Sequence, residues 1–322
     1  MTLTPPTIAD VHLARARLAG ILRPTPLARY PLLDEALGLE VYVKHENHNP
    51  TGAFKVRGGI NLVSSLQAEG RLTHAISAST GNHGQSIALA CQRLRVACTI
   101  VVPVGNNPEK NAAMRAFGAE VVESGRDFDE AREEVERRVV ASRGALRYIH
   151  SANEPLLIAG VGTYALEIFD DLPDADVIFV PIGGGSGAAG LVTVRDGLGR
   201  HARIVGVQAE RADAFARSWS GPERVVGERA DTFAEGLATR VTFDLTFGIL
   251  RHGLEAVVTL SEDELKEGVR LALQATHNLA EGAGAASLMA ARHWRACLQG
   301  KKVVCVMSGG NLDLATLRMI VG

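Results

Sequence analysis

The sequence predicts an α/β protein with two parallel β-sheets, and two observations lead to this fold class. Short β-rich segments alternate with helical segments along most of the 322 residues, which is typical of strand–helix–strand units. The strands expected around Val177 and Val303 are apolar at consecutive positions, as in strands that are covered on both faces. Because the alternation forms two separate series, we expect two domains with a cleft between them.

The first series has clear helix-start signals. Its expected elements are, in order, a strand at 74–80, a helix at 82–94, a strand at 96–103, a helix at 107–118, a strand at 119–124 and a helix at 127–144. Asn107 is the expected cap of the second helix, with Pro108 in the first turn and Gly118 as its end. Asp127 is followed three residues later by Glu130, which is the spacing of a capping box.

The second series contains the strands DVIFVP, RIVGVQA and KKVVCVM, and a helix for which Ser261 and Glu264 form a capping box.

The composition is that of an ordinary globular protein, with 46% hydrophobic residues, 22% charged residues and a formal net charge of −2. This balance gives no electrostatic reason to expect nucleic acid or a membrane surface as a partner. The opening MTLTPPTIADVHLA does not resemble a signal peptide, and no apolar run approaches the roughly 18 residues of a membrane-spanning helix. The four cysteines form no C-x-x-C pair, so we expect reduced thiols and a cytoplasmic location.

Lys55 stands among small and apolar residues in NPTGAFKVRGG, with no carboxylate within several positions. One interpretation is that its side chain extends along an apolar surface to water. The other is that burial keeps the amine neutral, which makes it a nucleophile toward carbonyl groups. The segment alone leaves both interpretations open.

Three glycine-containing turns follow predicted strands, and ligands bind at such strand ends in parallel α/β sheets. The turn at 77–86, SASTGNHGQS, opens a helix N-terminus toward an anion, although a simple helix cap such as Ser79 explains it equally well. The turn at 181–190, PIGGGSGAAG, has a backbone bare enough to wrap a phosphate. The turn at 306–311, VMSGGN, offers Ser308 for a neutral hydrogen bond, or is merely a tight turn.

The second turn also fits a dinucleotide-binding fingerprint. Gly185, Gly187 and Gly190 satisfy G-x-G-x-x-G after a strand, and Glu210 follows about twenty residues later. A nicotinamide-dependent oxidoreductase is therefore an alternative, but it leaves Lys55 and the other two turns without a function. One ligand uses all four features: pyridoxal 5′-phosphate has a phosphate, a ring bearing an oxygen and a nitrogen, and an aldehyde that condenses with lysine.

From RPTPL near the N-terminus to SGGN near the C-terminus, the sequence resembles the fold type II (tryptophan synthase β-like) pyridoxal-phosphate enzymes, within them the serine/threonine dehydratase and serine racemase group. The motifs PTGAFKVRG, STGNHGQ, PIGGGSGAAG, EGAGAA and SGGN occur in the order of that family. The resemblance implies two parallel-sheet domains with the cofactor in the cleft between them, and a homodimer or homotetramer. It also implies that one domain is inserted into the other, with a large domain from residues 1–64 and 152–322 and a small α/β domain from residues 65–151.

The resemblance also implies roles for individual residues. Lys55 corresponds to the lysine that carries the cofactor, and Phe54 to the aromatic residue beside the cofactor ring. Asn82 corresponds to the asparagine at the ring hydroxyl, and Ser308 to the residue at the ring nitrogen. The remaining residues form two loops: Gly183, Gly184, Gly185, Ser186 and Gly187 for the phosphate, and Ser79, Thr80, Gly81 and His83 for the substrate carboxylate.

The implied activity is that of a pyridoxal-phosphate-dependent ammonia-lyase. Lys55 removes the α-proton of L-threonine or L-serine, the β-hydroxyl leaves, and a 2-oxo acid and ammonia are the final products. Relatives act on 3-hydroxyaspartate or on aryl serines, and Arg57 and His83 are candidate cations for a distal carboxylate. Serine racemases have a serine at the position of Thr80, so racemisation is a further alternative.

Three acidic residues differ from the family pattern or have an open role. Glu210 matches one ligand of the divalent cation that several relatives bind, but Ala216 stands where an acidic partner is expected. Glu235 occupies the place of a usual aspartate. Glu281, in EGAGAA, is either near the far edge of the cofactor ring or a solvated charge at a helix start.

Overall fold

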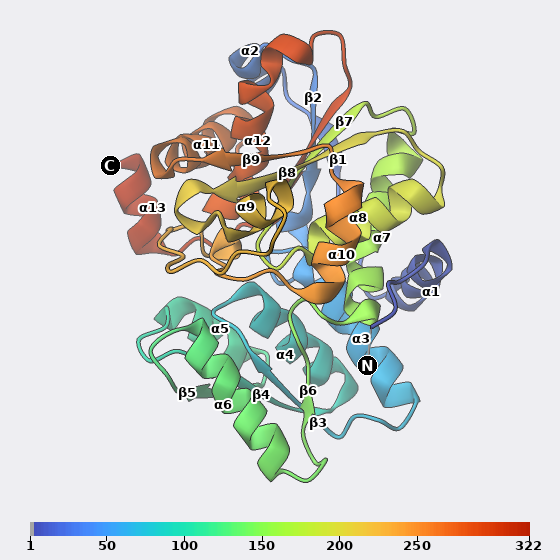
Figure 1. Ribbon diagram of the computed structural model, residues 1–322, viewed down its shortest axis with the longest axis vertical. Coiled ribbons are helices and arrows are strands. Elements are labelled where there is room, and N and C mark those ends of the chain that lie inside the picture. The colour runs from blue at the N-terminus through green and yellow to red at the C-terminus, as the bar shows by residue number, and fades with distance from the viewer. Residues whose placement is uncertain (1–2) are drawn as a thin grey trace.

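The computed structural model describes residues 3–322 and contains the two sheets that the sequence predicts (Figure 1). The larger sheet has six strands in the order β1-β2-β10-β7-β8-β9. Their bounds are β1 Leu27–Arg29, β2 Val41–His45, β7 Val177–Pro181, β8 Arg203–Ala209, β9 Ala256–Leu260 and β10 Val303–Met307. β1 is antiparallel to β2, and all other neighbours are parallel.

Helices cover both faces of the six-stranded sheet. The two layers are formed by α2 Pro31–Leu37, α11 Glu262–Thr276 and α12 Gly282–His293 on one face, and by α7 Pro155–Asp171, α8 Ser186–Gly197 and α10 Asp244–Gly253 on the other. Val177 and Phe179 of β7 belong to the first core, whereas Ile178 and Val180 belong to the second. Consecutive apolar residues therefore serve opposite faces, which confirms the predicted burial of this strand.

The smaller sheet has four parallel strands in the order β5-β4-β3-β6. Its elements are β3 His74–Ala78, α4 Asn82–Leu94, β4 Ala97–Val102, α5 Pro108–Ala116, β5 Glu120–Glu123, α6 Phe128–Ala141 and β6 Arg147–Tyr148. Ile100 packs toward α4 and α5, and its neighbour Val101 packs toward α6. All four strands lie within the expected small domain, 65–151, while α3 Lys55–Ala68 runs unbroken through its expected start. The domain boundaries stay a prediction.

The helix-start signals act largely as expected. The Asn107 side chain accepts hydrogen bonds from the first turn of α5, and the Asp127 side chain accepts one from Glu130 N. The Glu130 carboxylate, however, accepts from Arg126 N at 2.8 Å and not from Asp127, so only half of the expected capping box forms there. The helix α6 also ends at Ala141, three residues before the predicted end. At α11, Ser261 forms the complete capping box.

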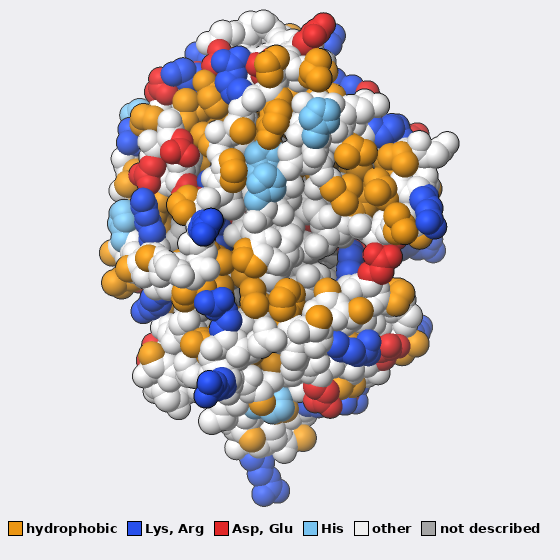
Figure 2. All heavy atoms as spheres, turned by 180° about the vertical axis from the view of Figure 1, so that it is seen from behind, with side chains coloured by type: hydrophobic (Ala, Val, Ile, Leu, Met, Phe, Trp, Pro, Cys, Tyr) orange, Lys and Arg blue, Asp and Glu red, His pale blue; other side chains and the backbone are white. Residues whose placement is uncertain are grey.

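The remaining elements are shorter or lie at the periphery. They are α1 Ile8–Leu18, α9 Ala214–Ser220, α13 Leu314–Val321 and the 3₁₀ turns η1 Glu46–His48, η2 Glu210–Ala212, η3 Glu235–Leu237 and η4 Arg295–Cys297. Within residues 3–322, no helix combines the length and the apolar character that crossing a membrane requires. On the face shown in Figure 2, basic and acidic side chains are scattered among uncharged ones.

A buried group of charges anchors the first turns of α3. Arg57 donates to Glu46 at 2.7 Å and to Glu167 of α7 at 2.6 Å, and Lys44 of β2 donates to Glu167 at 2.6 Å. The side chains of Arg57 and Glu46 are only 2% and 0% exposed. Burial opposes ionisation of Glu167, yet Arg57 and Lys44 lower its pKa overall. The network thus joins α3, α7, β2 and η1 around the Arg57 guanidinium.

Replacing Arg57 with alanine should lower the free energy of unfolding by about 3–5 kcal/mol, because it leaves two carboxylates without their main partner inside the protein. The measurement is urea unfolding followed by circular dichroism. Arg15→Ala is the matched control, since Arg15 pairs with Asp170 at the surface with about half of each side chain exposed, and it should cost less than about 1 kcal/mol. Equal effects of the two substitutions would contradict the anchoring role of Arg57.

Candidate active site

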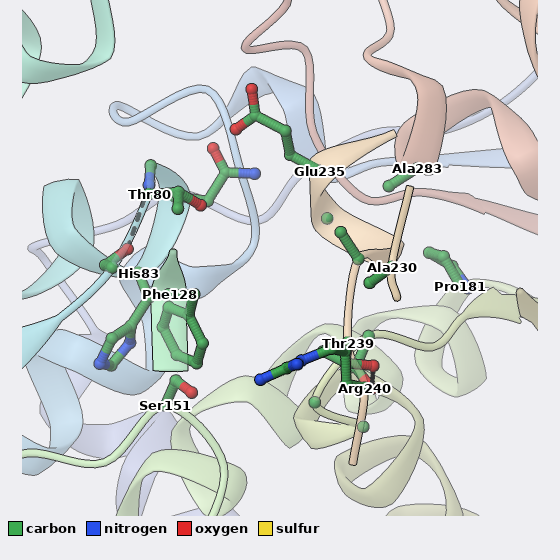
Figure 3. A pocket seen from close by; sticks show the side chains of 18 of the residues that line it. Thr80, His83, Phe128, Ser151, Pro181, Ala230, Glu235, Thr239, Arg240 and Ala283 are labelled. Atoms are coloured by element: carbon green, nitrogen blue, oxygen red, sulfur yellow. Dashed lines mark hydrogen bonds between the residues drawn. The ribbon is translucent and has the colours of Figure 1, made fainter. Parts of the chain in front are cut away.

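A cavity of about 640 Å³ lies between the two sheets at the carboxyl ends of their parallel strands (Figure 3). It is bordered by the turns after β3, β7 and β10 and by the start of α3. The residues that the resemblance assigns to the cofactor or to the substrate carboxylate all line it: Phe54, Lys55, Ser79, Thr80, Gly81, Asn82, His83, Gly183, Gly184, Gly185, Ser186, Gly187 and Ser308. Segments far apart in the sequence are therefore brought to one cavity.

Lys55 is the first residue of α3, and its amine points inward. Nζ donates to Ser186 Oγ at 2.8 Å and to Ser151 O at 3.3 Å, and it lies 5.2 Å from the centre of the Phe54 ring. Both acceptors are uncharged, and burial lowers the pKa of Lys55 to about 8. The amine lies in the cavity with uncharged acceptors and a lowered pKa, so the structure favours the interpretation of Lys55 as a nucleophilic lysine.

The 183–187 turn consists mainly of glycine, and neighbouring atoms leave little room for side chains at the glycine positions. A Cβ on Gly183 would lie 2.1 Å from Gly236 O, and a Cβ on Gly187 would lie 3.3 Å from the Phe54 ring. Gly185 adopts φ 85°, a left-handed conformation that suits glycine, and it caps α8. The N–H groups of the first turn of α8 have no partners within the helix, so this end of the cavity is suited to a phosphate.

The 79–83 loop is shaped by its own serine. Ser79 Oγ accepts hydrogen bonds from Gly81 N at 3.1 Å and from Gly84 N at 2.8 Å. The N-cap residue of α4 is Gly81 and not Ser79, but the Ser79 hydroxyl satisfies the N–H of Gly84 in the first turn, and Ser79 lines the cavity as well. A loop held in this way presents the start of α4 to the cavity, where its positive dipole favours a carboxylate.

His83 is a neutral group in this loop. Neither ring nitrogen has a hydrogen-bond partner among the described residues, although the side chain is buried. Burial, together with the charge of Lys55, lowers its pKa to about 3. The imidazole lies on the same side of the cavity as Ser151 (Figure 3). A neutral His83 does not provide the cation that a substrate with a second carboxylate would need, and Arg57, the other candidate, is occupied by Glu46 and Glu167 outside the cavity lining.

The opposite end of the cavity carries a chain of side-chain hydrogen bonds. Asn82 donates to Glu281 Oε1 at 2.8 Å and accepts from Asn311 at 2.7 Å. Glu281 is buried, and burial raises its pKa to about 7, so the interpretation of Glu281 as a solvated charge is wrong. Ser308 lines the same end, and its carbonyl accepts from Phe54 N at 3.0 Å.

Two ion pairs across the cavity were not anticipated from the sequence. Lys110 of α5 donates to Glu235 of η3 at 2.7 Å, and Arg240 donates to Asp129 of α6 at 2.8 Å. Each pair joins a helix beside the small sheet to the irregular segment at 221–243 beside the large sheet. Figure 3 shows the Arg240 side chain reaching toward Phe128 and Ser151. Lys110 gave a weak signal in the sequence, as a basic residue in the first turn of a helix, where acidic residues are preferred.

The dinucleotide interpretation of the 183–190 turn is wrong. Gly190 is not part of the cavity, because it packs on α7, where a Cβ would lie 2.8 Å from Gly162 N. Glu210 is exposed at the start of η2 and does not line the cavity. No group of three or more His, Cys, Asp or Glu residues suited to a metal occurs in the part of the chain described, and a cation at Glu210 stays a prediction.

The donor set fits pyridoxal 5′-phosphate. One end has the exposed N–H groups of a helix start, the middle has a buried amine with a lowered pKa, and the other end has an amide and a hydroxyl. These are the groups required for the phosphate, the aldehyde and the polar atoms of the ring. Two parallel-sheet units with this site between them define the fold type II class of pyridoxal-phosphate enzymes.

Comparisons with known proteins agree with this class. Residues 18–309 match the family described as "Pyridoxal-phosphate dependent enzyme", and the chain belongs to that family. An L-threonine ammonia-lyase from Thermotoga maritima is 36% identical over 317 residues, which are 98% of this chain and 78% of that protein.

Solved structures give the same result. A threonine deaminase from T.th. superposes with a TM-score of 0.89 at 34% identity, covering 96% of this chain and 99% of that one. A pyridoxal 5′-phosphate-dependent aspartate racemase superposes with a TM-score of 0.91 at 30% identity, covering 99% and 100%.

The rate at which pyridoxal phosphate loads onto the cofactor-free protein should rise with pH and level off above about pH 8. Only the neutral amine attacks an aldehyde, and the neutral fraction grows as the pH passes the lowered pKa of Lys55. Stopped-flow absorbance with the cofactor in excess measures the rate. Free lysine is the control for titration of the cofactor itself. A loading rate that continues to rise beyond pH 10, as for an ordinary lysine, would contradict burial of the amine.

Proposed function

We propose that this protein is a pyridoxal-phosphate-dependent dehydratase that converts L-threonine or L-serine, or both, into a 2-oxo acid and ammonia. The observation that carries the proposal is the inward-facing amine of Lys55, held between the phosphate end of the cavity and the substrate loop by uncharged partners. The names of the relatives, threonine ammonia-lyase and threonine deaminase, support the choice of reaction.

Separate parts of the cavity bind the phosphate, the cofactor ring and the substrate carboxylate in the proposed reaction. When bound, pyridoxal phosphate withdraws electrons from the substrate Cα and makes its proton removable. The N-terminus of α8 holds the phosphate group, and Ser308 supplies a neutral hydroxyl at the ring nitrogen. The 79–83 loop holds the substrate carboxylate at the start of α4, which orients the Cα–H bond toward Lys55.

Lys55 acts as the base. Its pKa of about 8 lies close to neutral pH, so the amine accepts the α-proton without being held in the charged form by a neighbouring carboxylate. Burial lowers the pKa of His83 to about 3, so its imidazole is too weak a base to compete with Lys55 for that proton.

The charges around the cavity favour a substrate with a small, uncharged side chain. Besides Lys55, the basic side chains that line the cavity include Lys110 and Arg240, and each of these two is neutralised by a carboxylate across the cavity. Arg229, which also lines the cavity, is exposed to solvent. A second substrate carboxylate that binds Lys110 or Arg240 would have to displace Glu235 or Asp129. This favours threonine and serine over 3-hydroxyaspartate.

We also propose a cytoplasmic homodimer or homotetramer. All four cysteines are free thiols, which suits a reducing compartment. An exposed apolar set on α11 and α13 offers a surface for a second copy to cover: Leu273, Leu314, Met319 and Val321.

The test of the proposed function is the absorbance spectrum of the purified protein with L-threonine, together with an assay of 2-oxo acid. We expect a yellow cofactor band that changes on addition of threonine while 2-oxo acid forms. Lys55→Ala should reduce turnover by about 10³-fold or more, because it removes the base. Lys301→Ala, at an exposed lysine, should leave turnover unchanged.

Two other results would redirect the proposal. A yellow band that threonine does not change would keep the cofactor and point to another β-hydroxy amino acid. The absence of any band after supplying pyridoxal phosphate would contradict the proposed function altogether.

Asp129→Asn should shift the substrate preference. It removes the negative charge that neutralises Arg240, so kcat/KM for 3-hydroxyaspartate relative to threonine should rise by about 10-fold. Steady-state kinetics with both substrates measure the ratio. Asp174→Asn, which breaks an exposed pair with Lys302, is the matched control. An unchanged ratio would show that Arg240 does not face the substrate side chain.

A further inference from the structure

Asn311 connects three segments of the active site. Its Nδ2 donates to Asn82 Oδ1 at 2.7 Å and to Thr51 O at 2.8 Å. Asn82 begins α4 beside the small sheet, Thr51 belongs to the loop that leads to Lys55, and Asn311 follows β10. The amide of one residue therefore touches both the substrate-loop helix and the lysine loop.

These contacts determine which way the Asn82 amide points. Thr51 O can only accept, so the Asn311 atom that faces it must be the NH₂ group, and Asn82 must present its oxygen to that group. The Nδ2 of Asn82 is then turned toward Glu281, to which it donates at 2.8 Å. An amide nitrogen carries two hydrogens, so Asn82 keeps a second N–H in a residue that lines the cavity.

We propose that Asn311 is a positioning residue that holds the Asn82 amide with an N–H directed to the ring oxygen of pyridoxal phosphate. The inference rests on the proposed function for its cofactor and for the role of Asn82. Without Asn311, the oxygen of the Asn82 amide loses its partner and only the contact with Glu281 holds the group, so the amide also populates orientations in which its oxygen faces the ring oxygen.

The neighbouring backbone is built around Asn311. Gly52 has φ 65°, and a Cβ there would lie 2.6 Å from Asn311 Oδ1. Gly310 N donates to Gly52 O at 2.9 Å, and Ala53 forms a β-bridge with Gly309. The turn after β10 and the lysine loop are thus joined where the Asn311 side chain passes between them, and any side chain at position 52 would push it away.

The test measures the affinity of the cofactor-free protein for pyridoxal phosphate by absorbance titration, in wild type, Asn311→Ala, Asn82→Ala and the double variant. We expect each single substitution to weaken binding by about 10-fold. The double variant should bind within about 2-fold of Asn82→Ala, because Asn311 acts through Asn82. The cofactor band should also move to a different wavelength in both single variants. Asn278→Ala, which removes only contacts within its own loop and to His48, should change neither readout.

A glycine pair gives an independent test that leaves both asparagines intact. Gly52→Ala should weaken cofactor binding as Asn311→Ala does, since it displaces Asn311. Gly38→Ala is the matched control, because Gly38 has the same φ of 65° but no atom within 4 Å of the added Cβ. It should therefore report the backbone strain alone and leave cofactor binding unchanged.

Additive losses in the double variant, or normal binding by Asn311→Ala, would overturn the proposal. Normal binding by Asn82→Ala would overturn it as well, since there would be nothing to position. Failure of the proposed function is a separate result, seen as wild-type protein that binds the cofactor but does not turn over threonine or serine.

Discussion

The active site depends on the burial of Arg57 between Glu46 and Glu167. This guanidinium lies two residues after Lys55 on the same helix, so the contacts that hold it also hold the reactive amine in place. Burying three charges is costly, and the group persists because each has a partner with good geometry. Lys55, by contrast, is left with uncharged acceptors. The first turn of one helix thus holds both a charged anchor and an amine of lowered pKa.

Parallel strand topology then determines what meets that amine. The turns after β3, β7 and β10 all lie at the carboxyl ends of their strands. They therefore converge on the start of α3, although they are far apart in the sequence. The small sheet supplies the loop for the substrate, and the large sheet supplies the loop for the phosphate. Asn82, Lys110 and Asp129 reach across from one unit to the other. The site is therefore completed only when the two units lie against each other.

The sequence was most informative where a short motif determines the structure of the residues within or next to it. The glycine-rich turn after a buried strand predicted the phosphate end of the cavity, and the lysine without a nearby carboxylate predicted the reactive amine in its middle. Helix caps such as Asn107 were also readable, because the cap and the N–H groups that donate to it lie within three residues.

Contacts between distant residues could not be read in this way. Lys110 and Glu235 are 125 positions apart, and the order of the strands decides that they meet. Arg57 seemed available for a substrate because its partners Glu46 and Glu167 lie 11 and 110 positions away. The dinucleotide fingerprint failed for a related reason, since Glu210, which supplies its acidic residue, is exposed and lies outside the cavity lining.

The position of β10 has a consequence for synthesis of the chain. This strand lies inside the six-stranded sheet, between β2 and β7, yet it is the last strand of the sequence. During translation β2 and β7 must therefore wait until residues up to Met307 have been made before the strand between them is complete, while the small unit, whose strands run only from His74 to Tyr148, can be completed earlier. Until β10 emerges, the edges of β2 and β7 that it joins are unpaired, and the nascent chain is exposed to aggregation there.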